Sequence, residues 1–102
     1  MQPTLKDHCK EAYKLLESKE IKGIMISKYL DKANHAFKTI ELRTNISVEK
    51  WVIDADKSGL YQYILEGDSL VKQSDSYEVR LYRDGVYNRT FIMDYKCDDL
   101  NK

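Results

Sequence analysis

Apolar and polar side chains alternate most clearly in residues 76–95, SYEVRLYRDGVYNRTFIMDY. Two runs rich in Tyr, Val, Thr and Phe flank Asp84-Gly85, a dipeptide typical of tight hairpin turns because glycine tolerates a positive φ. The pattern predicts an antiparallel hairpin with strands over 76–82 and 86–95.

The register of this hairpin is inferred from the two faces that each loop length would produce. A two-residue loop would place Arg80 opposite Arg89 and would mix polar and apolar side chains on both faces. A three-residue loop of Arg83-Asp84-Gly85, with a bulge at the glycine, separates the two kinds of residue and is favoured. It predicts an apolar face of Tyr77, Val79, Leu81, Tyr87, Phe91, Met93 and Tyr95, and a polar face of Glu78, Arg80, Tyr82, Asn88 and Thr90.

A 3.6-residue period dominates the first half of the chain and predicts three helices. The first covers about 4–19, where Thr4 and Asp7 resemble a capping box. The second covers about 24–43, because an apolar stripe continues there in helical phase. The third covers about 48–57 after a Ser47 cap, although its run WVIDA fits a short strand equally well. The stripe of the second helix is Ile26, Tyr29, Leu30, Ala33, Ala36, Phe37 and Ile40.

The pattern changes from Leu60 onward. LYQYILE, residues 60–66, has the composition of a strand, and a turn at Glu66-Gly67-Asp68 leads into a second short strand over 69–73. Residues 1–102 are therefore expected to form a single α+β domain. Its predicted architecture is three N-terminal helices packed on one face of a four-stranded antiparallel β-meander.

The composition is that of a globular domain with a well-solvated surface. The 102 residues are 42% hydrophobic and 33% charged with a formal net charge of zero, which excludes disorder and gives no general case for a nucleic-acid or membrane partner. No N-terminal stretch resembles a signal peptide, so we expect a cytoplasmic protein. Cys9 and Cys97 lie near opposite ends without a Cys-x-x-Cys spacing, and in a reducing compartment they are expected to be free thiols.

Catalytic and metal-binding chemistry has little support in the sequence. His8 and His35 are the only histidines, and neither lies at a spacing that builds a nucleophile–base pair or a zinc site with the cysteines. The four glycines are isolated, so no phosphate-binding loop is indicated. We expect a protein that is not an enzyme and that uses neither a metal nor another cofactor.

Two segments resemble a helix-turn-helix, residues 26–40 and 39–52. The second would use Arg43, Asn45 and Lys50 to contact DNA and would lead into a wing, as in a winged-helix transcriptional regulator. The recognition helix would also expose several acidic side chains, which opposes DNA binding. DNA is therefore the alternative partner.

Tyrosine is the most distinctive residue type, with eight in the chain and six of them from Tyr61 onward. One small core does not easily bury so many hydroxyl groups with partners, so some rings are expected at the surface. Tyr61, Tyr63 and Tyr82, together with Arg80, are the predicted contacts for a partner. The favoured function is a small non-enzymatic interaction module, a regulator or inhibitor that binds a protein through its Tyr-bearing sheet as a monomer or homodimer.

Overall fold

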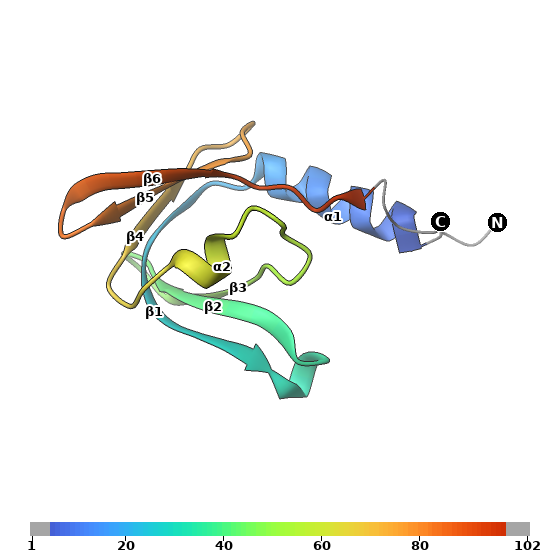
Figure 1. Ribbon diagram of the computed structural model, residues 1–102, viewed down its shortest axis with the longest axis horizontal. Helices are drawn as coiled ribbons and strands as arrows, with labels where there is room; N and C mark the ends of the chain where they lie inside the picture. The colour runs from blue at the N-terminus through green and yellow to red at the C-terminus, as the bar shows by residue number, and fades with distance from the viewer. Residues whose placement is uncertain (1–4, 98–102) are drawn as a thin grey trace.

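The structure is a computed structural model that describes residues 5–97. These residues form one long helix, a six-stranded sheet, a short second helix and a 3-10 turn (Figure 1). The elements in chain order are α1 (Leu5–Ser18), β1 (Ile21–Asp31), η1 (Lys32–Asn34), β2 (Phe37–Arg43), β3 (Val48–Val52), α2 (Leu60–Tyr63), β4 (Ser69–Lys72), β5 (Glu78–Arg83) and β6 (Val86–Ile92).

The sheet is antiparallel throughout and has the strand order β3-β2-β1-β4-β5-β6. β1 lies at its centre, pairing with β2 through a short connection and with β4 across a long one. The register of β1 against β2 shifts between Met25 and Ser27, and such a bulge bends a strand. Figure 1 shows β1 curving around α2, so that the sheet has a concave and a convex face.

The core lies on the concave face. Side chains from all six strands meet Leu60 and Ile64 of the α2 segment there. The pairing of Leu70 with Leu81 and of Val79 with Phe91 puts these residues on one side of the sheet. The buried residues of the core are Leu16, Ile21, Met25, Ile40, Leu42, Trp51, Ile53, Leu60, Ile64, Leu70, Val79, Leu81, Phe91, Met93, Tyr95 and Cys97.

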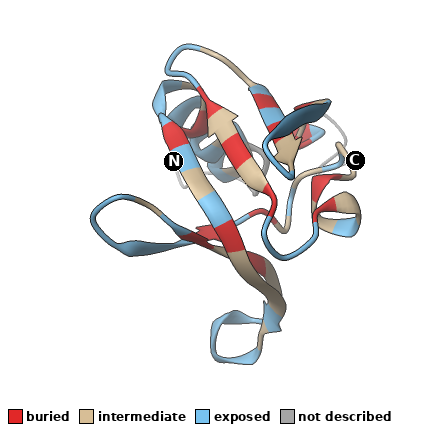
Figure 2. Ribbon diagram, turned by 90° about the vertical axis from the view of Figure 1, so that its left-hand side faces the viewer, coloured by how far each residue is buried: buried red, intermediate tan, exposed pale blue. Residues whose placement is uncertain are grey.

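The convex face carries the alternate residues of the same strands. Figure 2 looks from this side and shows β1 with no helix in front of it. One cross-strand row runs through Arg43, Ile24, Ser69, Tyr82 and Tyr87. Apolar and charged side chains therefore share a surface that no described helix covers.

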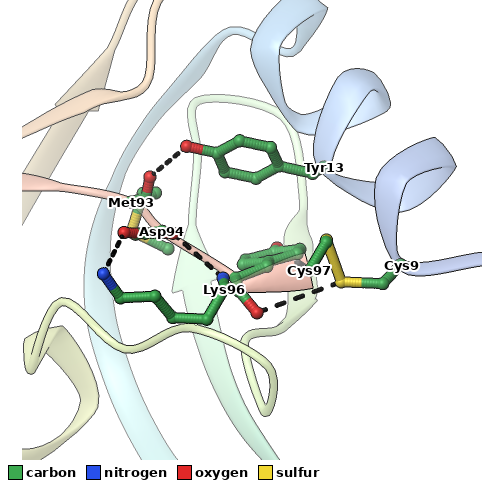
Figure 3. Close-up of a disulfide and its surroundings, with 7 residues drawn as sticks. Cys9, Tyr13, Met93, Asp94, Lys96 and Cys97 are labelled. Atoms are coloured by element: carbon green, nitrogen blue, oxygen red, sulfur yellow. Dashed lines mark hydrogen bonds and ion pairs between the residues drawn. A yellow bond between two sulfur atoms is a disulfide. The ribbon is translucent and has the colours of Figure 1, made fainter. Parts of the chain in front are cut away.

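Helix α1 packs at one end of the sheet against the segment that follows β6 (Figure 3). A disulfide joins Cys9 to Cys97, with 5.6 Å between the Cα atoms. The hydroxyl of Tyr13 donates a 2.7 Å hydrogen bond to the carbonyl of Met93, and the Tyr13 ring stacks on Tyr77 at 4.0 Å between centroids. The prediction of two free thiols is therefore wrong. That prediction and the cytoplasmic assignment supported each other, because disulfides persist mainly in oxidising compartments.

The buried side chain of Lys72 also holds α1 in place. Its ammonium donates to the carbonyls of Glu17 and Gln73 at 3.0 Å each and to that of Lys19. Two of these carbonyls lie at the end of α1, where backbone acceptors lack helical partners. Burial lowers the pKa of Lys72, because it disfavours the charged form.

The predicted fold class was wrong in its helices. The first predicted helix corresponds to α1, but residues 24–43 form most of β1, the η1 turn and β2. His35 and Ala36 both have φ near 57°, which a helix cannot accommodate. The helical phase of this stretch was a coincidence of spacing, because its β-branched and aromatic residues suit strands equally well.

The next two predicted elements were wrong, because the structure has a strand where a helix was predicted and a helix where a strand was predicted. The predicted helix over 48–57 is the strand β3 followed by a loop, and the predicted strand over 60–66 begins with the helix α2. The predicted strand over 69–73 is confirmed as β4. Four expected strands thus became six, and three expected helices became one long helix and one short one.

The predicted hairpin is confirmed, but its register is wrong. Arg83 pairs with Val86 across a two-residue loop in which Asp84 and Gly85 have φ of 55° and 78°, the positive values typical of a type I′ turn. The pairing then shifts, so that Arg80 faces Thr90 and the expected clash of arginines does not arise. Val79, Leu81 and Phe91 share the buried face as predicted. Tyr87 lies on the opposite face, beside Tyr82.

Within residues 5–97, no helix has the length and apolar character needed to cross a membrane.

Candidate binding site at helix α2

Helix α2 is a single turn whose position is fixed by its neighbours on both sides. Gly59 before it has φ of 92°, a left-handed conformation that favours glycine, and the backbone N–H of Ile64 closes the turn on the carbonyl of Leu60. Leu60 and Ile64 are fully buried in the core. The residues between them therefore lie at the surface of the concave side, with Tyr61 and Tyr63 half-buried and Gln62 exposed.

Two lysines from the central strands lie against Tyr61. The Nζ atoms of Lys28 and Lys38 are 5.2 and 5.9 Å from the centre of its ring, and that of Lys28 also donates a 2.7 Å hydrogen bond to the Tyr61 carbonyl. These distances are within the range of cation–π attraction. Ammonium groups of β1 and β2 are thus held beside one ring of α2.

Two arginines from the β5–β6 hairpin lie against Tyr63. The Cζ atoms of Arg83 and Arg89 are 4.9 and 5.0 Å from the centre of its ring. The Tyr63 hydroxyl donates a short hydrogen bond to Oδ1 of Asn88. Tyr63 therefore contacts the hairpin by both its ring and its hydroxyl.

Arg83 already has a carboxylate partner. Its Nε and Nη2 atoms donate to Oδ1 and Oδ2 of Asp68 at 2.9 and 2.8 Å, a bidentate pair in which the carboxylate is buried. These hydrogen bonds lower the pKa of Asp68 from its ordinary value. The ion pair ties the start of β4 to the end of β5.

The other three cations have no such partner within residues 5–97. Lys28, Lys38 and Arg89 form no ion pair with any acidic residue there. The surface that these groups make with the two rings is called the α2 face below. It consists of Lys28, Lys38, Tyr61, Tyr63, Arg83 and Arg89.

The predicted partner contacts are divided between two surfaces. Tyr61 and Tyr63 belong to the α2 face, and they come from a helix, not from the predicted sheet strand. Tyr82 and Arg80 lie on the convex face, where Tyr82 meets the Tyr87 ring at 5.9 Å. The structure therefore does not bring the four residues together.

The four cations of the α2 face were missed by the sequence analysis. They come from β1, β2, β5 and β6, and no short motif connects them. The high tyrosine content from Tyr61 onward was the only local signal, and it predicted the two rings but not the cations.

The proposed DNA-contacting residues lie in and beside β2 and β3. Arg43 ends β2, Asn45 is exposed in the following turn, and Lys50 is exposed in β3. Both segments that resembled a helix-turn-helix, 26–40 and 39–52, are made mainly of paired strands. The prediction of a helix-turn-helix is therefore wrong.

The groups considered for catalysis are dispersed. His8 is exposed on α1, and His35 is exposed in the turn after η1, with its ring 5.4 Å from that of Phe37. Neither sulfur of the Cys9–Cys97 disulfide is available as a nucleophile. No cluster of three or more metal-binding side chains occurs in the part of the chain that the structure describes.

Comparison of the chain with protein-family models, with curated proteins and with solved structures finds no significant match.

Proposed function

We propose that the protein is a small non-enzymatic binding module that recognises a partner protein through the α2 face. The observation that carries the proposal is the fixing of two tyrosine rings at the surface by four cations from distant strands. Tyrosine and arginine are the residue types enriched where interfaces bind most strongly. Rings that are already held in place also lose little conformational entropy when a partner binds.

The surroundings of the rings support a binding role. Tyr61 and Tyr63 are half-buried, so each has one part packed on the protein and another part open to a partner. The exposed Gln62 lies between them and offers a side chain that both donates and accepts hydrogen bonds. Rigid aromatic contacts beside adaptable polar groups are typical of recognition surfaces.

The test compares two pairs of tyrosines on opposite faces of the sheet. Tagged wild-type protein is used to capture partners from lysate of the source cells, in parallel with the variants Y61S/Y63S and Y82S/Y87S. We expect Y61S/Y63S to lose the captured protein, while Y82S/Y87S keeps it. Capture that survives in Y61S/Y63S would reject the α2 face as the site.

Folding of the variants is measured by thermal unfolding in the same buffer. The single variant Y61S leaves the hydrogen bond between Tyr63 and Asn88 intact. It replaces the double variant if that protein is unfolded, and the same loss of capture is expected from it. A folded Y61S that captures the partner as well as wild type does would also reject the proposal.

A further inference from the structure

The α2 face holds more positive charge than its own carboxylate neutralises. We propose that this face binds a carboxylate-rich segment of the partner protein, in which Asp or Glu side chains pair with Lys28, Lys38 and Arg89. The inference rests on the proposed function and names the chemistry of the partner.

Like charges lie close together on the α2 face. The Nζ atoms of Lys28 and Lys38 lie 5.2 and 5.9 Å from one ring centre, so they are at most about 11 Å apart. This separation is close to the Debye length, which is roughly 10 Å at 0.1 M salt and longer at lower salt. Arg83 and Arg89 approach Tyr63 in the same way. Like charges at this spacing repel each other, and an anionic ligand between them removes that repulsion.

The ion pair between Arg83 and Asp68 indicates the kind of anion that suits the α2 face. Arg83 binds the Asp68 carboxylate bidentately while it lies 4.9 Å from the Tyr63 ring centre. Arg89 lies at nearly the same distance, 5.0 Å, from the same ring and has no carboxylate within residues 5–97. The bidentate ion pair between Arg83 and Asp68 therefore shows the geometry in which Arg89 would bind a carboxylate of the partner.

Nucleic acid is a polyanion that could compete for the α2 face, and it fits this face less well. Nucleic acid is abundant in reducing compartments, whereas the Cys9–Cys97 disulfide favours an oxidising one. The α2 face also places only three cations that lack an ion pair within residues 5–97 around two separate rings. A nucleic-acid backbone is followed by a continuous basic groove, which contains many more cations. An acidic stretch of polypeptide, with carboxylates on flexible side chains, can reach both groups across the exposed Gln62.

The experiment measures the binding of fluorescent poly-L-glutamate by anisotropy at low salt and again at higher salt. The variant K28Q/K38Q/R89Q removes the three unpaired cations, and K22Q/K50Q/R80Q removes three exposed cations from other strand positions as a charge-matched control. We expect wild-type binding that weakens as salt rises and that is reduced about fivefold or more in the first variant. The control is expected to bind within about twofold of wild type. Thermal unfolding of each variant shows that it is folded.

Three results would overturn the inference. The first is no binding of poly-L-glutamate by wild type at low salt, and the second is an equal loss in both triple variants, which would assign the effect to net charge alone. The third is tighter binding of a heparin-type sulfated glycan or of single-stranded DNA, both titrated in parallel. A folded K28Q/R89Q double variant gives the same reading if the triple variant is unfolded.

The two experiments distinguish an error in the proposed carboxylate binding from an error in the proposed function. If Y61S/Y63S abolishes capture of a partner while poly-L-glutamate does not bind, the α2 face is a protein-binding site for a partner of other chemistry. If capture is unaffected by Y61S/Y63S, the proposed function fails whatever the anion data are.

Discussion

Removing the disulfide is expected to cost a large part of the stability of the protein. Cys9 and Cys97 are separated by 88 residues, so the bond closes a loop that includes nearly the whole chain. In the chain-entropy model, a loop of this length restricts the unfolded state by about 4.6 kcal/mol at 25 °C. Small domains are stable by only about 5–15 kcal/mol, so the variant C9A/C97A should be folded but far less stable.

The effect is measured by urea unfolding followed by far-UV circular dichroism. With a typical slope of about 1–2 kcal/mol per molar urea, the midpoint of C9A/C97A should lie about 2–5 M below that of the oxidised wild type. Adding a reductant should move the wild-type midpoint to that of the variant, and it should leave the variant unchanged. A loss of less than about 1 kcal/mol would refute this reasoning and would mean that the two chain ends stay together without the bond.

Three further predictions concern single residues. K72M keeps the buried stem of the side chain but leaves three backbone carbonyls without their donor. The free energy of unfolding, measured by urea titration, should therefore fall by about 1–3 kcal/mol. An unchanged free energy would contradict the role of Lys72 in capping α1. Arg83 lowers the pKa of Asp68 in the folded state, so the contribution of Asp68 to stability should be present above its ordinary pKa of 3.8. It should be lost as the pH falls through the lower folded-state pKa. D68N should lack this part of the pH dependence of stability, and identical acid titrations of the two proteins would contradict the prediction. G23A adds a Cβ that would lie 3.0 Å from the Arg43 carbonyl oxygen. The melting temperature should therefore fall by an amount that corresponds to about 1–3 kcal/mol of stability. An unchanged melting temperature would show that β1 and β2 move apart easily at this position.

Local sequence patterns were sufficient where neighbouring residues decide the structure. The tight turn at Asp84-Gly85 and the alternation around Val79 and Phe91 identified the hairpin, because both signals lie within one short segment. The amphipathic run of α1 was recognised for the same reason. The hairpin register was predicted wrongly because a bulge after Tyr87 shifts the pairing, so that Arg80 faces Thr90 and not Arg89. The turn residues do not predict this bulge.

Pairing between distant segments was beyond the reach of these patterns. Ile21–Ile24 of β1 pairs with Ser69–Lys72 of β4, and the long connection between them contains β2, β3 and α2. A stripe at helical spacing over 24–43 has the same residue types as two curved strands, and only the distant partner decides between them. The α2 face was missed for the same reason, since its cations are brought together by this pairing.

The edges of the sheet are less suited to binding another chain than the proposed site on the α2 face. An open edge strand can bind another chain through its backbone, but β3 has only five residues and carries the exposed charges of Glu49 and Lys50. β6 is longer, yet its register shift near Asn88 interrupts the regular spacing of backbone groups that strand addition requires. Both edges therefore have features that discourage pairing. The α2 face has the opposite character, because its rings are fixed by contacts within the protein while three of its cations form no ion pair with a carboxylate in residues 5–97.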